Sequence, residues 1–335
     1  MPRPSRVVIA GAGGFVGAAL VRSFAAAGAE LRAIGRRGPI PWDDPGAVAR
    51  AVDGAEVLIN LSGKSVNCRY TEANREEILR SRVDTTRALR EAVAAAPRPP
   101  RVWLNASTAT IYRHELLRPN TEVSGVLGAG FSVDVARAWE REFFADELPG
   151  TRRVALRMAV VLGDGPATRM LLALARAGLG GPQLDGWAPQ HRRYRGIGPQ
   201  PTGDGRAPQH RTRGRQKFSW IHVDDVVGAV RFLIERDDIW GPVNLVAPKP
   251  VDNRSLMRAL RRVVGAPVGL PATRAMLEPA MWALRTEPEL VLKSRWVAPG
   301  VLAEAGYVFA HAELEPALRS LRCAATTRSR PRRGS

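Results

Sequence analysis

Three glycines spaced three residues apart make the N-terminal segment the first place where this chain could do chemistry. The stretch VVIAGAGGFVGAAL passes from an apolar β-branched run to an alanine-rich one, with Gly11, Gly14 and Gly17 in the pattern G-x-x-G-x-x-G. A strand that turns directly into a helix leaves unpaired N–H groups and the positive helix end at one point, which favours a phosphate. The pattern therefore predicts a dinucleotide-binding turn, with Phe15 and Val16 opening the helix beside the cofactor.

The end of the second predicted strand, residues 30–34, indicates which dinucleotide fits. A carboxylate about 20 residues beyond the glycines holds the ribose 2′-hydroxyl of NAD, whereas arginine accommodates the extra phosphate of NADP. No acidic residue ends this strand, and Arg36 and Arg37 follow it. The sequence predicts NADP(H), with Arg36 as the first partner of the 2′-phosphate because a guanidinium can bind phosphate through two N–H groups. A pair of solvated loop arginines is the alternative.

A parallel sheet is needed to position these residues, and the pattern of the first half predicts one. Short apolar runs alternate with longer helical patterns, which is typical of α/β folds. We expect a Rossmann-type doubly wound parallel sheet with a smaller C-terminal substrate lobe. The predicted strands cover residues 6–10, 30–34, 56–61, 102–106, 153–161 and 218–221, and the predicted helices cover 71–95, 131–144 and 253–264.

The domain organisation follows from where this pattern stops and resumes. We predict an NADP(H)-binding domain over 1–165, completed by about 218–247. The substrate lobe takes 166–186 and 248–323. A segment rich in Gly, Pro, Gln and Arg over 187–217 predicts a basic disordered insert, and 324–335 predicts a disordered basic tail.

Charge is concentrated in those two segments. The chain has a formal charge of +18, of which 187–217 carries +7 and the tail carries +4. This distribution favours solvated basic segments over a nucleic-acid partner, although phosphate binding by these segments is an alternative.

Composition also limits the class of protein. The two cysteines, Cys68 and Cys323, make no disulfide framework, and the five histidines show no metal-ligand grouping, so we expect no metal. We find no signal-type or membrane-spanning apolar run. A cytoplasmic protein without a membrane partner is the expectation.

Several passages occur together in an order that resembles a known family. They are GAGGFVG, VLINLSGKSV, SRVDTTRALREAV, ASTATIY, ALRMAVVLG, GRQKFSWIHVDDVV and GPVNLVAPKP. Their order resembles the extended short-chain dehydrogenase/reductase superfamily, and more narrowly its atypical epimerase-like branch of NADP(H)-binding oxidoreductases. LVLKSRWVAPGVLAEAGYVF is similar to the C-terminal domain of unknown function in that branch.

The resemblance implies further cofactor contacts. Leu61 and Ser62 match positions that lie along the cofactor, and Val161 matches the residue near the nicotinamide. Glu77 and Arg82 match helical positions that reach the dinucleotide, with Arg82 favoured as a phosphate partner. Each has an alternative interpretation as a core residue or a solvated helix face.

The resemblance also implies a catalytic hydroxyl at Thr108, together with a tyrosine whose phenol transfers the proton and a lysine that lowers the pKa of that tyrosine. Ser132 and Ala136 stand at the last two positions, and neither can do that work. Tyr112 is the closest phenol to Thr108 and a catalytic candidate, although packing is its favoured role. The leading prediction is an NADP(H)-dependent oxidoreductase that acts on a small polar substrate. The alternative is a non-catalytic NADP(H)-binding sensor or scaffold.

Overall fold

The computed structural model describes residues 4–284 and 287–328, and a six-stranded parallel sheet forms its centre. The strand order is β10-β5-β4-β3-β1-β2. These strands are β1 (Arg6–Ala10), β2 (Glu30–Ile34), β3 (Val57–Asn60), β4 (Val102–Thr108), β5 (Arg152–Met158) and β10 (Gly241–Leu245).

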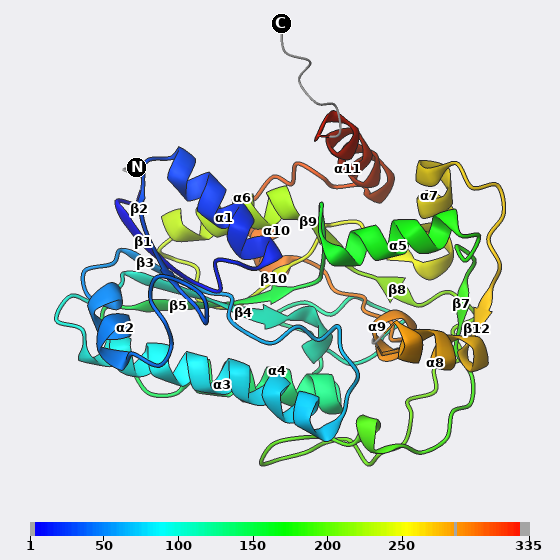
Figure 1. Ribbon diagram of the computed structural model, residues 1–335, viewed down its shortest axis with the longest axis horizontal. Helices are drawn as coiled ribbons and strands as arrows, with labels where there is room; N and C mark the ends of the chain where they lie inside the picture. The colour runs from blue at the N-terminus through cyan, green and yellow to red at the C-terminus, as the bar shows by residue number, and fades with distance from the viewer. Residues whose placement is uncertain (1–3, 285–286, 329–335) are drawn as a thin grey trace, which may run out of the picture.

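Helices cover both faces of the sheet (Figure 1). One face is covered by α1 (Phe15–Ala26), α6 (Val223–Glu235) and α10 (Gly300–Glu304), and the other by α2 (Pro45–Val52), α3 (Glu72–Ala95) and α4 (Phe131–Phe144). Along β1, Val7 and Ile9 pack into the core under α1 and α6, whereas Val8 packs into the core under α2 and α3. A strand buried on both faces needs a continuous apolar run, as this one has. The predicted doubly wound fold is confirmed.

Sheet topology opens a crevice where a ligand can enter. From β1 the chain crosses to β2 on one side and then to β3 on the other, so the loops after β1 and β3 diverge. Gly11 N donates to Ile34 O at 3.0 Å, and Leu61 N donates to Ala10 O at 2.8 Å. The three strand ends are thus held together at one edge.

The remaining elements form a smaller cluster at the right of Figure 1. Helices α5 (Pro166–Arg176), α7 (Asn253–Val264) and α11 (Leu314–Arg328) share an apolar core. Around it lie α8 (Arg274–Ala283), α9 (Glu289–Leu292), β6 (Val160–Leu162) with β9 (Trp220–His222), β7 (Gln183–Leu184) with β12 (Ala272–Thr273), and β8 (Lys217–Phe218) with β11 (Val251–Asp252). Among the described residues, no helix is both long and apolar enough to cross a bilayer.

The segment 187–217 differs from the expected disordered insert, because buried polar side chains hold its backbone. Arg75 on α3 donates to Arg193 O and Arg195 O, each at 2.7 Å. Asp134 on α4 accepts from the backbone N–H groups of Ile197 and Thr202, each at 3.0 Å. Composition predicted disorder because the segment lacks apolar residues, but these hydrogen bonds replace apolar burial.

The C-terminal tail also differs from expectation. Helix α11 continues to Arg328, inside the predicted disordered tail, and 329–335 lie outside the described residues. At the start of α6, His222 is the N-cap and accepts from Asp224 N at 3.2 Å. Asp225 accepts from the N–H groups of Ala310 and His311, at 2.7 and 3.0 Å.

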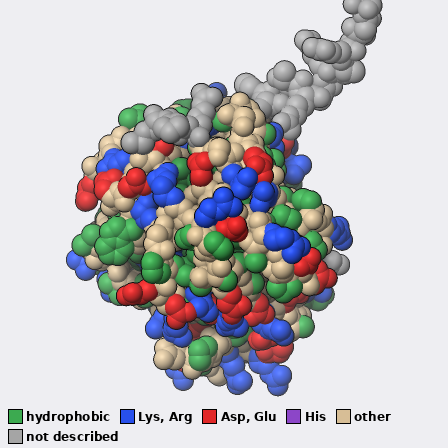
Figure 2. Space-filling model, turned by 90° about the vertical axis from the view of Figure 1, so that its left-hand side faces the viewer, with side chains coloured by type: hydrophobic (Ala, Val, Ile, Leu, Met, Phe, Trp, Pro, Cys, Tyr) green, Lys and Arg blue, Asp and Glu red, His purple; other side chains and the backbone are tan. Residues whose placement is uncertain are grey.

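Figure 2 shows how the charged side chains of this basic chain are distributed over one face. Basic and acidic side chains are interspersed over this face, and no large area of one sign is visible. Many arginines elsewhere on the chain have acidic partners, for example Arg157 with Glu140 at 2.6 Å and Arg274 with Asp185 at 2.8 Å. Local pairing therefore neutralises part of the high arginine content.

Candidate functional site

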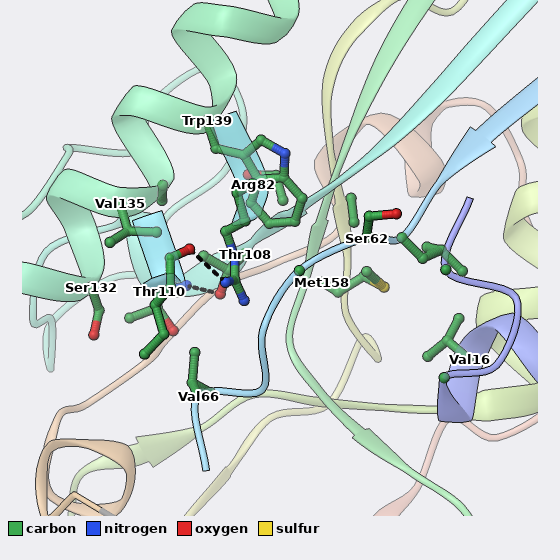
Figure 3. Close-up of a pocket in the computed structure, with 18 of the residues that line it drawn as sticks. Val16, Ser62, Val66, Arg82, Thr108, Thr110, Ser132, Val135, Trp139 and Met158 are labelled. Atoms are coloured by element: carbon green, nitrogen blue, oxygen red, sulfur yellow. Dashed lines mark hydrogen bonds between the residues drawn. The ribbon is translucent and has the colours of Figure 1, made fainter. Parts of the chain in front are cut away.

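A cavity of about 350 Å³ lies at the carboxyl edge of the sheet (Figure 3). Its walls come from the glycine turn between β1 and α1, the loop after β3, the end of β4 and the first turns of α4. These segments are far apart in sequence, and the crevice between β1 and β3 brings them together. Most of the predicted cofactor residues line the cavity, namely Gly11, Gly14, Phe15, Val16, Leu61, Ser62 and Arg82.

Close backbone packing explains two of the three glycines. Gly11 has φ +81°, and a Cβ there would lie 2.8 Å from the backbone carbon of Leu61. A Cβ at Gly17 would lie 2.4 Å from the carbonyl oxygen of Gly11. Both distances are too short for a side chain, so these glycines allow the turn and seat the helix against it.

Gly14 has a different role, because it leaves space open. It is the N-cap of α1, and no side chain caps the first turn of that helix. The nearest atom to a Cβ at Gly14 would be Gly11 O at 3.4 Å. The first turn of α1 thus presents amide groups and its positive dipole end to the cavity, an arrangement that binds anions.

Arg82 lies across the cavity from this turn, on α3. Its guanidinium donates to Ile78 O at 2.9 Å and lies over the Trp139 ring, 5.1 Å from the ring centroid. No carboxylate of the described residues lies within ion-pair distance of it. Burial lowers the pKa of Arg82 to about 10, so the side chain is still a cation at neutral pH. A cation without a counter-ion, lining a cavity, favours an anionic ligand.

The other predicted cofactor residues lie outside the cavity lining. Arg36 is 81% exposed and lies 3.8 Å from the carboxylate of Glu77, which also pairs with Lys64. Arg37 is exposed. Val161 is on β6 and packs against the core under α6.

Ser62 adds an unsatisfied polar atom to the cavity. Its backbone N–H donates to Asn60 Oδ1 at 3.0 Å, but its buried hydroxyl has no hydrogen-bond partner among the described residues. A buried hydroxyl of this kind is satisfied when a polar ligand fills the cavity.

Thr108, at the end of β4, lines the end of the cavity that lies away from the glycine turn (Figure 3). Its Oγ1 accepts from Thr110 N at 3.1 Å, which leaves the hydroxyl proton free to donate. Ser132 and Ala136 line the same end, on α4. The resemblance implies a tyrosine and a lysine at these two positions, and neither a phenol nor an ammonium stands there.

Tyr112 is placed in the core rather than in this cavity. It is 2% exposed, and its hydroxyl donates to Asn244 Oδ1 at 2.9 Å and accepts from Arg157 Nη1 at 2.8 Å. Arg157 in turn pairs with Glu140. These contacts support packing, and not proton transfer, as the role of Tyr112.

Comparison with known proteins agrees with this geometry. The NAD dependent epimerase/dehydratase family matches residues 7–245. The chain belongs to this family. A domain of unknown function, DUF1731, matches residues 279–321. Both halves of the resemblance drawn from the sequence are thereby confirmed.

Relatives in this family share most of the chain. The bovine epimerase family protein SDR39U1 is 31% identical over 326 residues, which cover 94% of this chain and 99% of that protein. Epimerase family protein YfhF of Bacillus subtilis is 29% identical and covers 84% of this chain and 83% of its own. A crystal structure of human SDR39U1 (isoform 2) with NADPH has a TM-score of 0.79 at 27% identity, covering 94% of this chain and 98% of that one.

Tyr70, the last residue of the NCRY loop and not one of the predicted site residues, also lies at this cavity. Tyr70 follows β3 and lines the cavity, with its ring edge-on to Phe131 at 4.7 Å. Burial raises the pKa of its phenol, and a hydrogen bond with Ser132 opposes that shift. The available signal was its place after a strand whose carboxyl end faces the crevice.

The histidines are grouped, contrary to the expectation from spacing. His222 and His311 lie with ring centroids 3.8 Å apart, and Asp224 Oδ2 lies 3.4 Å from His222 Nδ1 and 3.5 Å from His311 Nε2. Three such groups are a possible metal-ligand set. Sequence spacing could not show this cluster, because the loop before α11 is brought back to the start of α6 only by the fold.

Proposed function

We propose that this chain is an NADP(H)-dependent oxidoreductase of the epimerase family, acting on a small polar substrate. The observation that carries the proposal is the pair of anion-binding features on one cavity: the uncapped first turn of α1 and the Arg82 guanidinium. Their separation across the crevice suits an extended ligand with more than one phosphate.

The residues present fit the proposed cofactor. Gly14 gives a phosphate access to the backbone, and the unpartnered Ser62 hydroxyl offers a polar contact. NADPH in the human relative's structure supports the same choice, as does the absence of a carboxylate at the end of β2. Arg36 and Arg37 are the proposed partners of the 2′-phosphate, and Arg36 takes this role by moving from Glu77.

When bound, NADP(H) supplies a hydride. The chain's own residues then hold the substrate: the Thr108 hydroxyl donates a hydrogen bond to the substrate oxygen, and Leu61 and Val161 border the cofactor. Tyr70 is the phenol of the cavity, and its hydrogen bond with Ser132 gives it a route for proton exchange. In this proposal residues 1–165 with 218–247 bind the nucleotide, and 166–186 with 248–323 bind the substrate.

A second candidate function has its own support. The family resemblance puts Ser132 and Ala136, which both line the cavity, at the positions of the tyrosine and lysine that the superfamily uses. A protein that binds NADP(H) without turnover, as a sensor or scaffold, needs neither group. A cytoplasmic location remains a prediction from the sequence.

Calorimetric titration with NADPH and NADH tests the proposed cofactor. We expect tighter binding of NADPH, and Arg36→Ala should weaken NADPH by about tenfold while leaving NADH unchanged, since a charged hydrogen bond contributes about 1.5–3 kcal/mol. Arg50→Ala, at an exposed arginine of α2, is the matched control. Equal affinity for both dinucleotides would overturn the choice of NADP(H).

Turnover separates the two candidate functions. In a screen of carbonyl and hydroxyl substrates, the oxidoreductase oxidises NADPH and Thr108→Ala lowers the rate. Tight NADPH binding without turnover in the whole screen would favour the sensor instead.

A further inference from the structure

A second cavity, of about 220 Å³, adjoins the first, and residues of the proposed substrate lobe line part of it. Two hydrogen bonds form the wall between them. Lys293 Nζ donates to Thr110 O at 2.8 Å, and Ser132 Oγ donates to Glu289 Oε2 at 3.3 Å. Thr110 and Ser132 line the first cavity, whereas Lys293 and Glu289 line the second. A molecule in the second cavity is therefore separated from the first cavity, which Thr108 lines, only by the side chains of this wall.

Lys293 brings a buried positive charge to this second cavity. It is 7% exposed, and its ammonium has one hydrogen bond, to Thr110 O. Across the described part of the chain, no carboxylate lies within ion-pair distance of it, although Glu289 exerts a longer-range attraction. Burial lowers the pKa of Lys293 to about 8, which leaves it charged at neutral pH. Two of its three N–H donors have no acceptor among the described residues, so an anion in the cavity could accept from them.

The arginines of the cavity, in contrast, are neutralised. Arg274 pairs with Asp185 at 2.8 Å and with Glu278 at 3.2 Å. Arg113 pairs with Glu115 at 2.8 Å. These ion pairs make Lys293 the unneutralised cation within the described lining.

Two histidines add uncharged donors. The rings of His114 and His210 stack with centroids 3.6 Å apart and planes 9° apart. His114 Nδ1 accepts from Ser294 N at 3.0 Å, so the neutral ring has its proton on Nε2 and can donate there. Burial lowers the pKa of both rings, that of His114 to about 4, and they stay neutral at pH 7.

We propose that the second cavity binds a carboxylate or phosphate group of the substrate, with Lys293 as its charged anchor and His114 and His210 as neutral donors. The inference rests on the proposed function and narrows the substrate class to small molecules with an oxyanion at one end. The other end reaches Thr108 in the first cavity. Glu289 accepts a hydrogen bond from Ser132 at the wall between the two cavities, and its negative charge repels an anion there. The oxyanion is therefore directed toward His114 and His210.

The proposal also assigns a role to the segment 187–217. Tyr194 and His210 from this segment line the cavity, and the Tyr194 hydroxyl accepts from Arg274 Nη2 at 3.1 Å. His210 is held by its backbone N–H, which donates to Asp185. The segment thus acts as a specificity-determining wall of the substrate site.

Calorimetric titration of the full chain with inorganic phosphate and, separately, with malonate tests the site and distinguishes the two oxyanion types. It is run at constant ionic strength, with and without saturating NADPH. We expect at least one of these anions to bind, and Lys293→Met to weaken that binding tenfold or more. Lys249→Met, at an exposed lysine paired with Glu313, should bind as the wild type does. Equal anion affinity in Lys293→Met, or no binding of either anion to the wild type, would overturn the inference.

Two further measurements keep the test independent of folding and of the cofactor proposal. His210→Phe, in the loop segment, should also weaken anion binding, and unchanged NADPH affinity in both variants shows an intact fold. Anion binding that depends on Lys293 in a chain that takes up no NADPH would refute the proposed function and retain the anion site. NADPH binding without any anion binding that depends on Lys293 would refute the anion site and retain the proposed function.

Discussion

The guanidinium of Arg82 lies over the indole of Trp139, 5.1 Å from the ring centroid, where a counter-ion would be expected. A ring face attracts a cation but does not neutralise it. The cavity therefore contains a positive charge that the described part of the protein does not neutralise.

Replacing this arginine should separate binding from stability. Arg82→Met should lower NADPH affinity by about ten- to a hundredfold, because it removes a charged partner of a phosphate. The midpoint of thermal unfolding should stay the same or rise, because a partly buried cation without a counter-ion is lost. Calorimetry and thermal melts measure both quantities.

The control for this prediction lies on the same helix. Arg80 is exposed and pairs with Asp84 at 3.3 Å, so Arg80→Met should leave NADPH affinity unchanged. A fall of similar size in both variants would show a general loss of positive charge, contrary to a specific role for Arg82.

Gly17→Ala should destabilise the turn. The new Cβ would lie 2.4 Å from Gly11 O, so helix and turn must separate, and we expect a loss of about 1–3 kcal/mol in the free energy of unfolding. Gly13→Ala is the control, since a Cβ at Gly13 meets nothing within 4 Å. Urea denaturation compares the two, and equal stability would contradict the close packing described.

The two tyrosines near the site should respond in opposite ways. Tyr112→Phe leaves Asn244 Oδ1 without its donor and removes an acceptor from Arg157, so we expect it to destabilise the fold by about 1–3 kcal/mol. Tyr70→Phe should preserve the fold and lower NADPH oxidation, because it removes the phenol that lines the cavity. Denaturation and turnover measured on both variants check this. A catalytic defect confined to Tyr112→Phe would reverse the assignment.

Acid should weaken the fold through His114. Its pKa is lowered from 6.5 to about 4, so the unfolded chain binds more protons between these values and stability falls as pH decreases through that window. The ring is only half-buried, so we expect a loss on the order of 2 kcal/mol, below the full value that the shift implies.

Urea denaturation from pH 7 to pH 4 measures this loss. His114→Asn keeps an acceptor for Ser294 N but does not titrate, and it should flatten the dependence. His191→Asn, at an exposed histidine, should leave the dependence as in the wild type. A wild-type slope retained in His114→Asn would show that other groups cause it.

Local patterns predicted much of the framework. The proposed bounds of β1, β2, α4 and α7 match those of the structure, because apolar periodicity and the glycine turn act within one element and its neighbours. The glycine pattern placed Gly11 and Gly14, and the family resemblance implied Ser62, Arg82 and Thr108. The structure brings these five residues to one cavity. Each of them adjoins the carboxyl end of a parallel strand or faces it from a helix.

Contacts between distant segments were decided only by the tertiary structure. The segment 187–217 has few apolar residues, and its order depends on Arg75 and Asp134, which come from helices far away in sequence. The sequence places the Tyr112 phenol close to Thr108 and so made it a catalytic candidate. In the fold, Arg157 and Asn244 instead bind its hydroxyl in the core.

The sequence by itself thus determined the sheet, the glycine turn and the absence of a phenol and an ammonium at positions 132 and 136. Tertiary structure alone decided that Arg82 and Lys293 have no counter-ion within the described part of the chain and that His114 stacks on His210. The physical reason is that chain periodicity encodes which residues are buried, whereas the charge balance of a cavity depends on every segment that the fold brings to its wall.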